Sequence, residues 1–305
     1  MTKQAQGTLA SGILLTLLGA ICFSTKAIFV KLAYRETEVD AISLLALRMI
    51  FSLPFFVIAA AISSSKQTNV RFTAKQWLGV ALVGCLGYYI SSLLDFLGLQ
   101  YVTAGIERLI LFIYPTLVLL MSAIIFKVKI KPIQWIALLI TYAGLFVAFI
   151  SEAQGQAVYN KDFFLGSFFI LVCAFTYAAY IVGSGRLIPI VGSAKFNSYA
   201  MSFASIGVLL HFFITSNVSL LHFSPAVYIY SFLMALLSTV IPSYLVVAGI
   251  KRIGSDNAAI VGSIGPVSTI IMAYFFLQET ISLLQLIGTA LILAGVLLVG
   301  KQKTG

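Results

Sequence analysis

Residues 124–144, IIFKVKIKPIQWIALLITYAG, decide the fold, because they join two apolar runs through one short basic segment. Lys127, Lys129 and Lys131 lie between the runs, and Pro132 suits the first turn of the next helix. An apolar run of about 20 residues is long enough to cross roughly 30 Å of hydrocarbon. The pattern therefore predicts two membrane helices joined by a tight, positively charged turn.

Composition extends this prediction to the whole chain of 305 residues, which is 61% hydrophobic and 9% charged, with a mean hydropathy of +1.07. A soluble domain has about 45–50% apolar and about 25% charged residues. The sequence therefore predicts an all-α membrane protein with ten transmembrane helices. The expected helices span about residues 9–32, 41–62, 77–100, 103–126, 132–150, 164–185, 196–215, 226–249, 255–278 and 281–300.

The positions of lysine and arginine predict the orientation, because cytoplasmic loops retain positive charge. With the N-terminus inside, only Lys31, Arg35 and Lys161 fall in outer loops. The basic residues then expected on the cytoplasmic side are Lys3, Lys66, Arg71, Lys75, Lys127, Lys129, Lys131, Arg186, Lys195, Lys251, Arg252, Lys301 and Lys303. We therefore expect an inner-membrane protein with both termini in the cytoplasm.

The chain also carries an internal repeat, which appears when the sequence is displaced by 151 residues. The displacement aligns Gly98 with Gly249, Pro115 with Pro266, Gln134 with Gln285, and Ala143-Gly144 with Ala294-Gly295. Because each half holds five expected helices, an odd number, the halves must face opposite sides of the membrane. We predict a first repeat over residues 1–153 and an inverted second over 154–305, together one transmembrane domain. Secondary transporters with this architecture bind substrate between the repeats.

Four stretches are similar to a known family. They are FSTKAIFVK at 23–31, Arg48, LDFLGLQY at 94–101, and the segment from Glu107 to Thr116 that contains Tyr-Pro-Thr. On these residues the chain resembles the drug/metabolite transporter superfamily, in its ten-helix EamA-type branch. The resemblance covers nearly the whole chain, although Phe126-Lys127-Val128 departs from the Leu-Gly-Glu that ends the corresponding helix in the family. It implies a transporter of amino acids, related metabolites or drugs, often an exporter.

Five charged residues fall inside expected membrane helices: Lys26, Arg48, Asp95, Glu107 and Arg108. A charge at the bilayer centre costs at least about 2.5 kcal/mol, so these side chains should face the bundle interior and pair. In a binding site, the carboxylates would take an amine or a proton, and the cations would take a carboxylate. In the alternative, the charges form a static salt-bridge cluster. We expect Arg48 to be a structural charge and the other four to bind substrate or couple its transport.

Polar side chains near these charges are further candidates. On a regular helix, Tyr88 and Ser92 share a face with Asp95, and Tyr114 shares a face with Glu107. At the repeat spacing, Val246, Ala258 and Ala259 replace Asp95, Glu107 and Arg108, so the second half offers tyrosines in place of charges. The candidates added to the site are Tyr88, Ser92, Tyr114, Tyr180 and Tyr244.

Together these features favour a secondary transporter of small polar metabolites that works by alternating access, with export favoured. The alternative is a lipid flippase-like membrane protein. The sequence lacks a P-loop and the motifs His-Glu-x-x-His and Gly-x-Ser-x-Gly, so we expect no enzyme activity, no cofactor and no metal. The net charge of +10 is spread over small clusters, which argues against nucleic acid. The expected partners are a small-molecule substrate and the lipid bilayer, with the chain a monomer or a homodimer.

Overall fold

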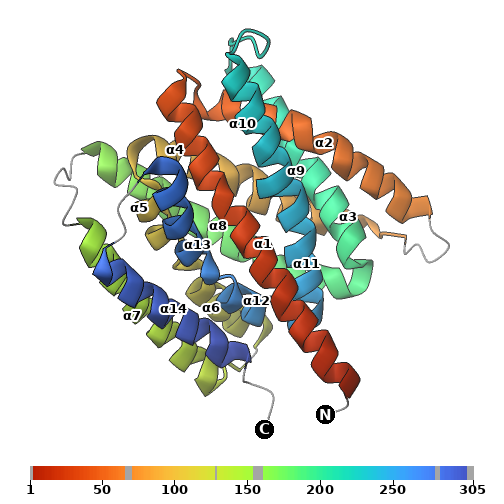
Figure 1. The fold of residues 1–305 in the computed structure, drawn as a ribbon. Coiled ribbons are helices and arrows are strands. Elements are labelled where there is room, and N and C mark those ends of the chain that lie inside the picture. The colour runs from red at the N-terminus through yellow and green to blue at the C-terminus, as the bar shows by residue number, and fades with distance from the viewer. Residues whose placement is uncertain (1–2, 66–70, 128, 154–160, 279–281, 301–305) are drawn as a thin grey trace.

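The structure is a computed structural model that describes residues 3–65, 71–127, 129–153, 161–278 and 282–300. Within these ranges the chain is built of helices and contains no strand (Figure 1). The elements are α1 (Lys3–Glu36), α2 (Ala41–Ser65), α3 (Ala74–Gly84), η1 (Cys85–Ile90), α4 (Ser91–Tyr101), α5 (Ala104–Leu111), α6 (Tyr114–Phe126), α7 (Pro132–Ala153), α8 (Lys161–Val191), α9 (Ser193–Thr215), α10 (Pro225–Ala235), η2 (Leu236–Val240), α11 (Ile241–Ile253), α12 (Ser255–Val261), α13 (Ile264–Met272), η3 (Ala273–Leu277) and α14 (Leu283–Gly300).

Seven helical segments among the described residues are long and apolar enough to cross a membrane. They are α1, α2, the run α3–η1–α4, α8, α9, the run α10–η2–α11, and the run α12–α13–η3. Each of the other three expected crossings contains a shorter apolar helix, Tyr114–Phe126, Pro132–Val147 or Leu286–Gly295. The all-helical membrane fold is thus confirmed, and the count of ten crossings stays a prediction.

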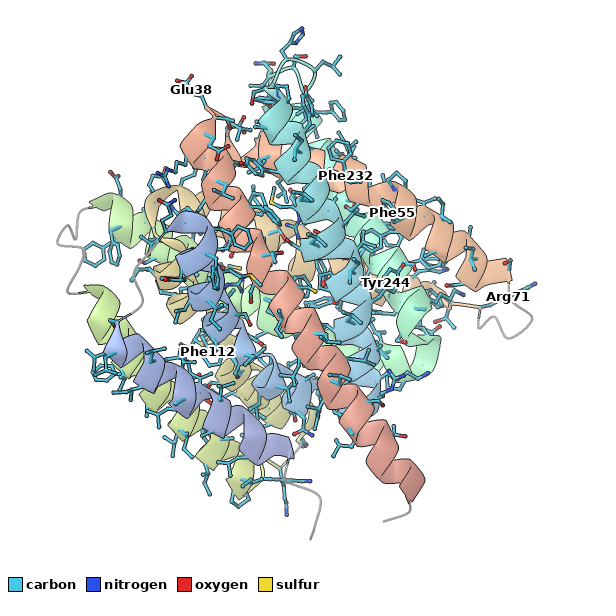
Figure 2. All side chains as sticks on the ribbon, in the orientation of Figure 1. Glu38, Phe55, Arg71, Phe112, Phe232 and Tyr244 are labelled. Carbon is cyan, nitrogen blue, oxygen red and sulfur yellow. The ribbon has the colours of Figure 1, made fainter. Side chains whose placement is uncertain are left out.

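The outer surface of the bundle is apolar, as a lipid-facing surface must be. Ile124, Ile214 and Phe275 are between 71% and 80% exposed, and Phe55 and Phe232 are also exposed on α2 and α10 (Figure 2). Side chains of this kind over a whole surface would form apolar patches far larger than a water-soluble monomer carries. Exposed apolar side chains are expected where the surface faces the hydrocarbon of a lipid bilayer.

Two helices begin at threonine caps that are readable in the sequence. Thr73 accepts a hydrogen bond from the backbone of Gln76 at 3.3 Å, and the Gln76 side chain accepts one from the Thr73 backbone at 2.9 Å. Thr103 likewise accepts from the backbone of Ile106 at 3.2 Å and so fixes the start of α5. Such caps satisfy backbone groups that the first turn leaves unpaired. The start of α5 sets the direction in which the charged pair at 107–108 points.

Two departures from regular helix recur at the spacing of the predicted repeat, whereas the π-helix η3 has no counterpart in α6. The π-helix η1 begins at residue 85 and η2 begins at residue 236, which is 151 residues later. Lys127 and Gln278 are the described non-glycine residues with positive φ, at 54° and 57°, and they are separated by the same 151 residues. A turn also precedes both Pro115 and Pro266. The two halves therefore share irregular backbone features as well as apolar pattern.

Helices from the two halves pack against one another in matching pairs. α1 packs on α11 as α4 packs on α8, while α2 packs on α9 and α7 on α14. Figure 1 shows α7 and α14 side by side at one edge of the bundle. A Cβ added to Gly98 would lie 3.0 Å from the carbonyl oxygen of Gly166, and one added to Gly249 would lie 3.2 Å from that of Gly12. Glycine allows this close backbone approach, which interlocks the halves.

Candidate functional site

A cavity of about 90 Å³ lies between helices of the two halves. Side chains from α1, α2, η1, α4, α5 and α6 form one part of its wall, and side chains from α8, α11, α12 and α13 form the other. The volume has room for roughly six to nine waters at 10–15 Å³ each. It is therefore large enough for a small organic molecule.

Three cationic side chains line this cavity: Lys26 from α1, Arg48 from α2 and Arg108 from α5. Among the described residues, no carboxylate lines it. Asp95 and Glu107 have side chains that are 1% and 0% exposed, whereas those of Lys26 and Arg108 are 13% and 11% exposed. The cations therefore face the cavity, and the carboxylates lie behind them.

Ion pairs join four of these charges into one chain. Lys26 Nζ lies 2.7 Å from Asp95 Oδ2 and 3.7 Å from Glu107 Oε1. Arg108 Nε lies 3.2 Å from Glu107 Oε2, and its Nη2 donates to the carbonyl of Phe23 at 3.0 Å. Buried charges are tolerated when they are paired in this way. The four groups form a neutral set that joins α1, α4 and α5 of the first half.

Arg48 stands apart from that network. Its Nε donates to Thr239 Oγ1 at 2.6 Å, and its guanidinium carbon lies 5.5 Å from the centroid of the Phe96 ring. Arg48 is 1% exposed, and within the described residues its Nη1 has no hydrogen-bond partner and its side chain forms no ion pair. Among the described residues, Lys26 and Arg108 form the ion pairs with Asp95 and Glu107, and Arg48 does not. That Arg48 is a structural charge stays a prediction.

Aromatic side chains form a second feature of the wall. Tyr88, Tyr114 and Tyr177 line the cavity, and the rings of Tyr114 and Tyr177 meet edge to face with centroids 5.1 Å apart. Tyr180 lies behind them, 5.1 Å from Tyr88 and 5.9 Å from Tyr177 between ring centroids. Tyrosine rings offer a ligand both apolar surface and a hydroxyl.

The predicted candidates divide into those that line the cavity and those that do not. The lining residues are Lys26, Arg48, Tyr88, Ser92, Arg108 and Tyr114. Tyr244 lies elsewhere, with its hydroxyl 2.7 Å from Ser198 Oγ and its ring 5.9 Å from that of Phe56. Figure 2 shows Tyr244 and the cavity-lining Phe112 on opposite sides of α1. The described residues contain no cluster of three His, Cys, Asp or Glu side chains that could hold a metal.

One spacing argument is corrected by the structure. The expectation that Glu107 and Tyr114 share a face assumed one continuous helix, but α5 ends at Leu111 and α6 begins at Tyr114. Proline has no N–H to donate, so Pro115 cannot make the hydrogen bond that would continue α5 into α6. Tyr114 reaches the cavity after this turn, and its hydroxyl donates to the carbonyl of Ala259 at 3.1 Å.

Several lining residues lie outside the predicted set. Cys173, Tyr177 and Ile181 are four residues apart on α8 and all face the cavity. Their spacing is that of one helix face. Within a helix that is apolar on every side, however, no contrast in polarity marks which face turns inward.

Comparison with known proteins identifies the family. The sequence model of the EamA-like transporter family matches residues 10–150 and again residues 164–301. An uncharacterized transporter of Bacillus subtilis (strain 168), YcbK, is 32% identical over 92% of this chain and 89% of its own length. An uncharacterized inner membrane transporter of Salmonella typhimurium, YicL, is 21% identical over 97% of each chain.

A solved crystal structure shares the fold, with a TM-score of 0.72 over 97% of this chain and 98% of that one, at 18% sequence identity. The two matches of the family model fall on the two halves of the chain, each of which contributes to the cavity wall. The chain therefore belongs to the EamA-like transporter family, whose members are membrane transporters of the drug/metabolite type.

Proposed function

We propose that this protein is a secondary transporter that carries a small polar metabolite, an amino acid, a related compound or a drug, through the cavity between its halves. The observation that carries the proposal is that cations line this cavity, two of which, Lys26 and Arg48, lie in helices long and apolar enough to cross a membrane. Intramembrane charges are expensive and commonly mark a substrate or ion pathway. Export across the inner membrane is the favoured direction.

The proposed architecture has ten crossings in two inverted repeats, residues 1–153 and 154–305. Irregular backbone at positions 151 residues apart and the double match of the family model both support it. Single cysteines in a background without Cys22, Cys85 and Cys173 test the orientation. Asn217→Cys should react with an impermeant reagent from outside intact cells, and Gln302→Cys should not. Labelling of the second cysteine from outside would contradict the proposed topology.

Alternating access needs contacts between the halves that can open at one face while they close at the other. Ser122 donates to Asp256 Oδ1 at 2.8 Å, which joins the end of α6 to the start of α12. Tyr230 donates to Glu36 Oε2 at 2.6 Å, which joins α10 to the end of α1. Each contact links one half to the other, and in the proposed topology the first lies on the cytoplasmic side and the second on the outer side. We propose that the two contacts break in alternation.

The transport function is tested in proteoliposomes that contain the purified full chain. Labelled amino acids, aromatic monocarboxylates, amines and nucleosides are offered as a panel, each against an inside pool of the same unlabelled compound. Counterflow of at least one compound above protein-free liposomes is the expected result. Movement of a fluorescent phospholipid between leaflets, with counterflow of no panel member, would favour the flippase alternative instead.

A further inference from the structure

We infer that the cavity takes a monocarboxylate with an uncharged, apolar body. This inference rests on the proposed transport function and names the substrate class of the same site. It follows from three features of the described residues. These are the balance of charge around the cavity, the position of the cations in front of the carboxylates, and the apolar chemistry of the opposite wall.

The balance of charge leaves one cation without a counterpart. Lys26 and Arg108 pair with Asp95 and Glu107, and Arg48 lies outside those pairs. Arg48 is buried, lines the cavity, and has an Nη1 with no hydrogen-bond partner among the described residues. A buried, uncompensated charge is costly. One carboxylate on the ligand would supply the missing negative charge, and a guanidinium is well suited to bind it through charge-assisted hydrogen bonds.

The order of the charges disfavours a ligand that carries an ammonium group. Asp95 and Glu107 are the two carboxylates of the cluster, and their side chains are at most 1% exposed behind the cations. An ammonium in the cavity would meet Lys26 or Arg108 before it reached either carboxylate. Free acids are therefore favoured over amines, and also over amino acids, whose α-ammonium would meet no carboxylate among the described residues of the wall.

The opposite wall fits an uncharged body. Ile181, Val246, Ala258 and Ala259 line the cavity from the second half, together with the ring of Tyr177. Contact with such side chains is favourable for apolar carbon and unfavourable for a second charge. A ring can also meet Tyr177 edge to face, as Tyr114 already does at 5.1 Å between ring centroids. The ligand therefore carries its charge at one end only.

Three probes with one phenyl ring and different charge test the inference on the purified full chain. They are phenylacetate, 2-phenylethylamine and 2-phenylethanol, added separately during thermal unfolding in detergent. Phenylacetate should raise the melting temperature in a saturable way, and the amine and the alcohol should not. Equal or greater stabilisation by 2-phenylethylamine would overturn the inference and leave transport standing. If no probe stabilises the protein, the inference also fails, and the proteoliposome panel decides separately whether transport stands.

Substitutions locate the binding group. Arg48→Met should weaken the apparent affinity for phenylacetate by at least about tenfold, the loss expected for one charge-assisted contact. Lys251→Met removes an exposed cation on α11 outside the cavity and should leave that affinity unchanged. If Arg48→Met does not fold, Arg48→Lys keeps the charge and should bind phenylacetate more weakly than the native protein. Native affinity in a folded Arg48 variant would overturn the role given to Arg48.

Discussion

The two halves of the chain supply the same cavity with opposite chemistry. At the positions of Asp95, Glu107 and Arg108 in the first half, the second half has Val246, Ala258 and Ala259, which all line the cavity. Both halves nevertheless form a π-helix, a turn before a proline and a left-handed residue at matching places. The second half reaches this backbone without the charges. The fold therefore does not require them, and their presence in the first half calls for a functional reason.

The largest effect on stability is expected when only one member of the Glu107–Arg108 pair is replaced by its counterpart in the second half. Glu107→Ala alone removes one carboxylate and leaves Arg108 and Lys26 in excess, so unfolding should become easier by about 3–5 kcal/mol, the cost of breaking a buried pair. Glu107→Ala with Arg108→Ala copies Ala258-Ala259 and removes the pair as a unit. The double variant should therefore recover most of the loss in detergent melting temperature. A double variant that is no more stable than the single one would contradict this.

Lys26→Met should cost less stability, because Lys26 lines the cavity and water can take the place of its ammonium group beside Asp95. The same variant should lose its response to ligand, since one cation of the wall is gone. The measurement is melting temperature with and without phenylacetate. Early melting with a full response to phenylacetate would show that Lys26 serves the scaffold alone.

A smaller effect is expected on the coupling of transport to a proton gradient. An intramembrane carboxylate is the usual carrier of a transported proton. If Asp95 or Glu107 has this role, Asp95→Asn or Glu107→Gln should abolish flux driven by a pH gradient while counterflow continues. Proteoliposomes with and without an imposed gradient separate the two activities. Unchanged dependence on the gradient in both variants would remove this pair as the coupling site.

The smallest effect is expected outside the cavity. Tyr244→Phe removes the hydrogen bond to Ser198 and should cost about 1 kcal/mol of stability with no change in counterflow. Tyr114→Phe is the matched control, because it also removes one hydrogen bond, to Ala259, but at the cavity wall. It should alter the apparent affinity for substrate. Equal effects of the two variants on counterflow would argue against the cavity as the site.

The sequence predicts the fold better than it predicts the site, for physical reasons. Length and apolarity alone identify membrane helices, and the spacing of Pro115 and Pro266 indicates the repeat. Charges in apolar helices are conspicuous, so Lys26 and Arg108 could be named as site candidates, and both line the cavity. Arg48, which the sequence suggested as a structural charge, lines it too. That Arg48 forms no ion pair within the described part of the chain depends on which helices meet, which is information about tertiary packing. The spacing of apolar residues along the sequence does not reveal which helices meet.

Tyr244 is a predicted site residue that the structure places outside the cavity. A tyrosine in a membrane helix is a reasonable candidate for a polar site, yet this one packs against Phe56 and bonds Ser198. On α8, Tyr177 lines the cavity, whereas the predicted candidate Tyr180 does not. Helix rotation decides between such residues, and an apolar helix gives no sequence signal for its rotation.

Counterflow through the double variant Glu107→Ala with Arg108→Ala tests most directly whether the charged wall serves transport. The panel of labelled amino acids, aromatic monocarboxylates, amines and nucleosides is offered to proteoliposomes with native protein and with the variant. We expect native protein to move at least one compound, and the variant to move none of those while its melting temperature stays close to native. Native rates in the variant for every compound that the native protein moves would contradict the account.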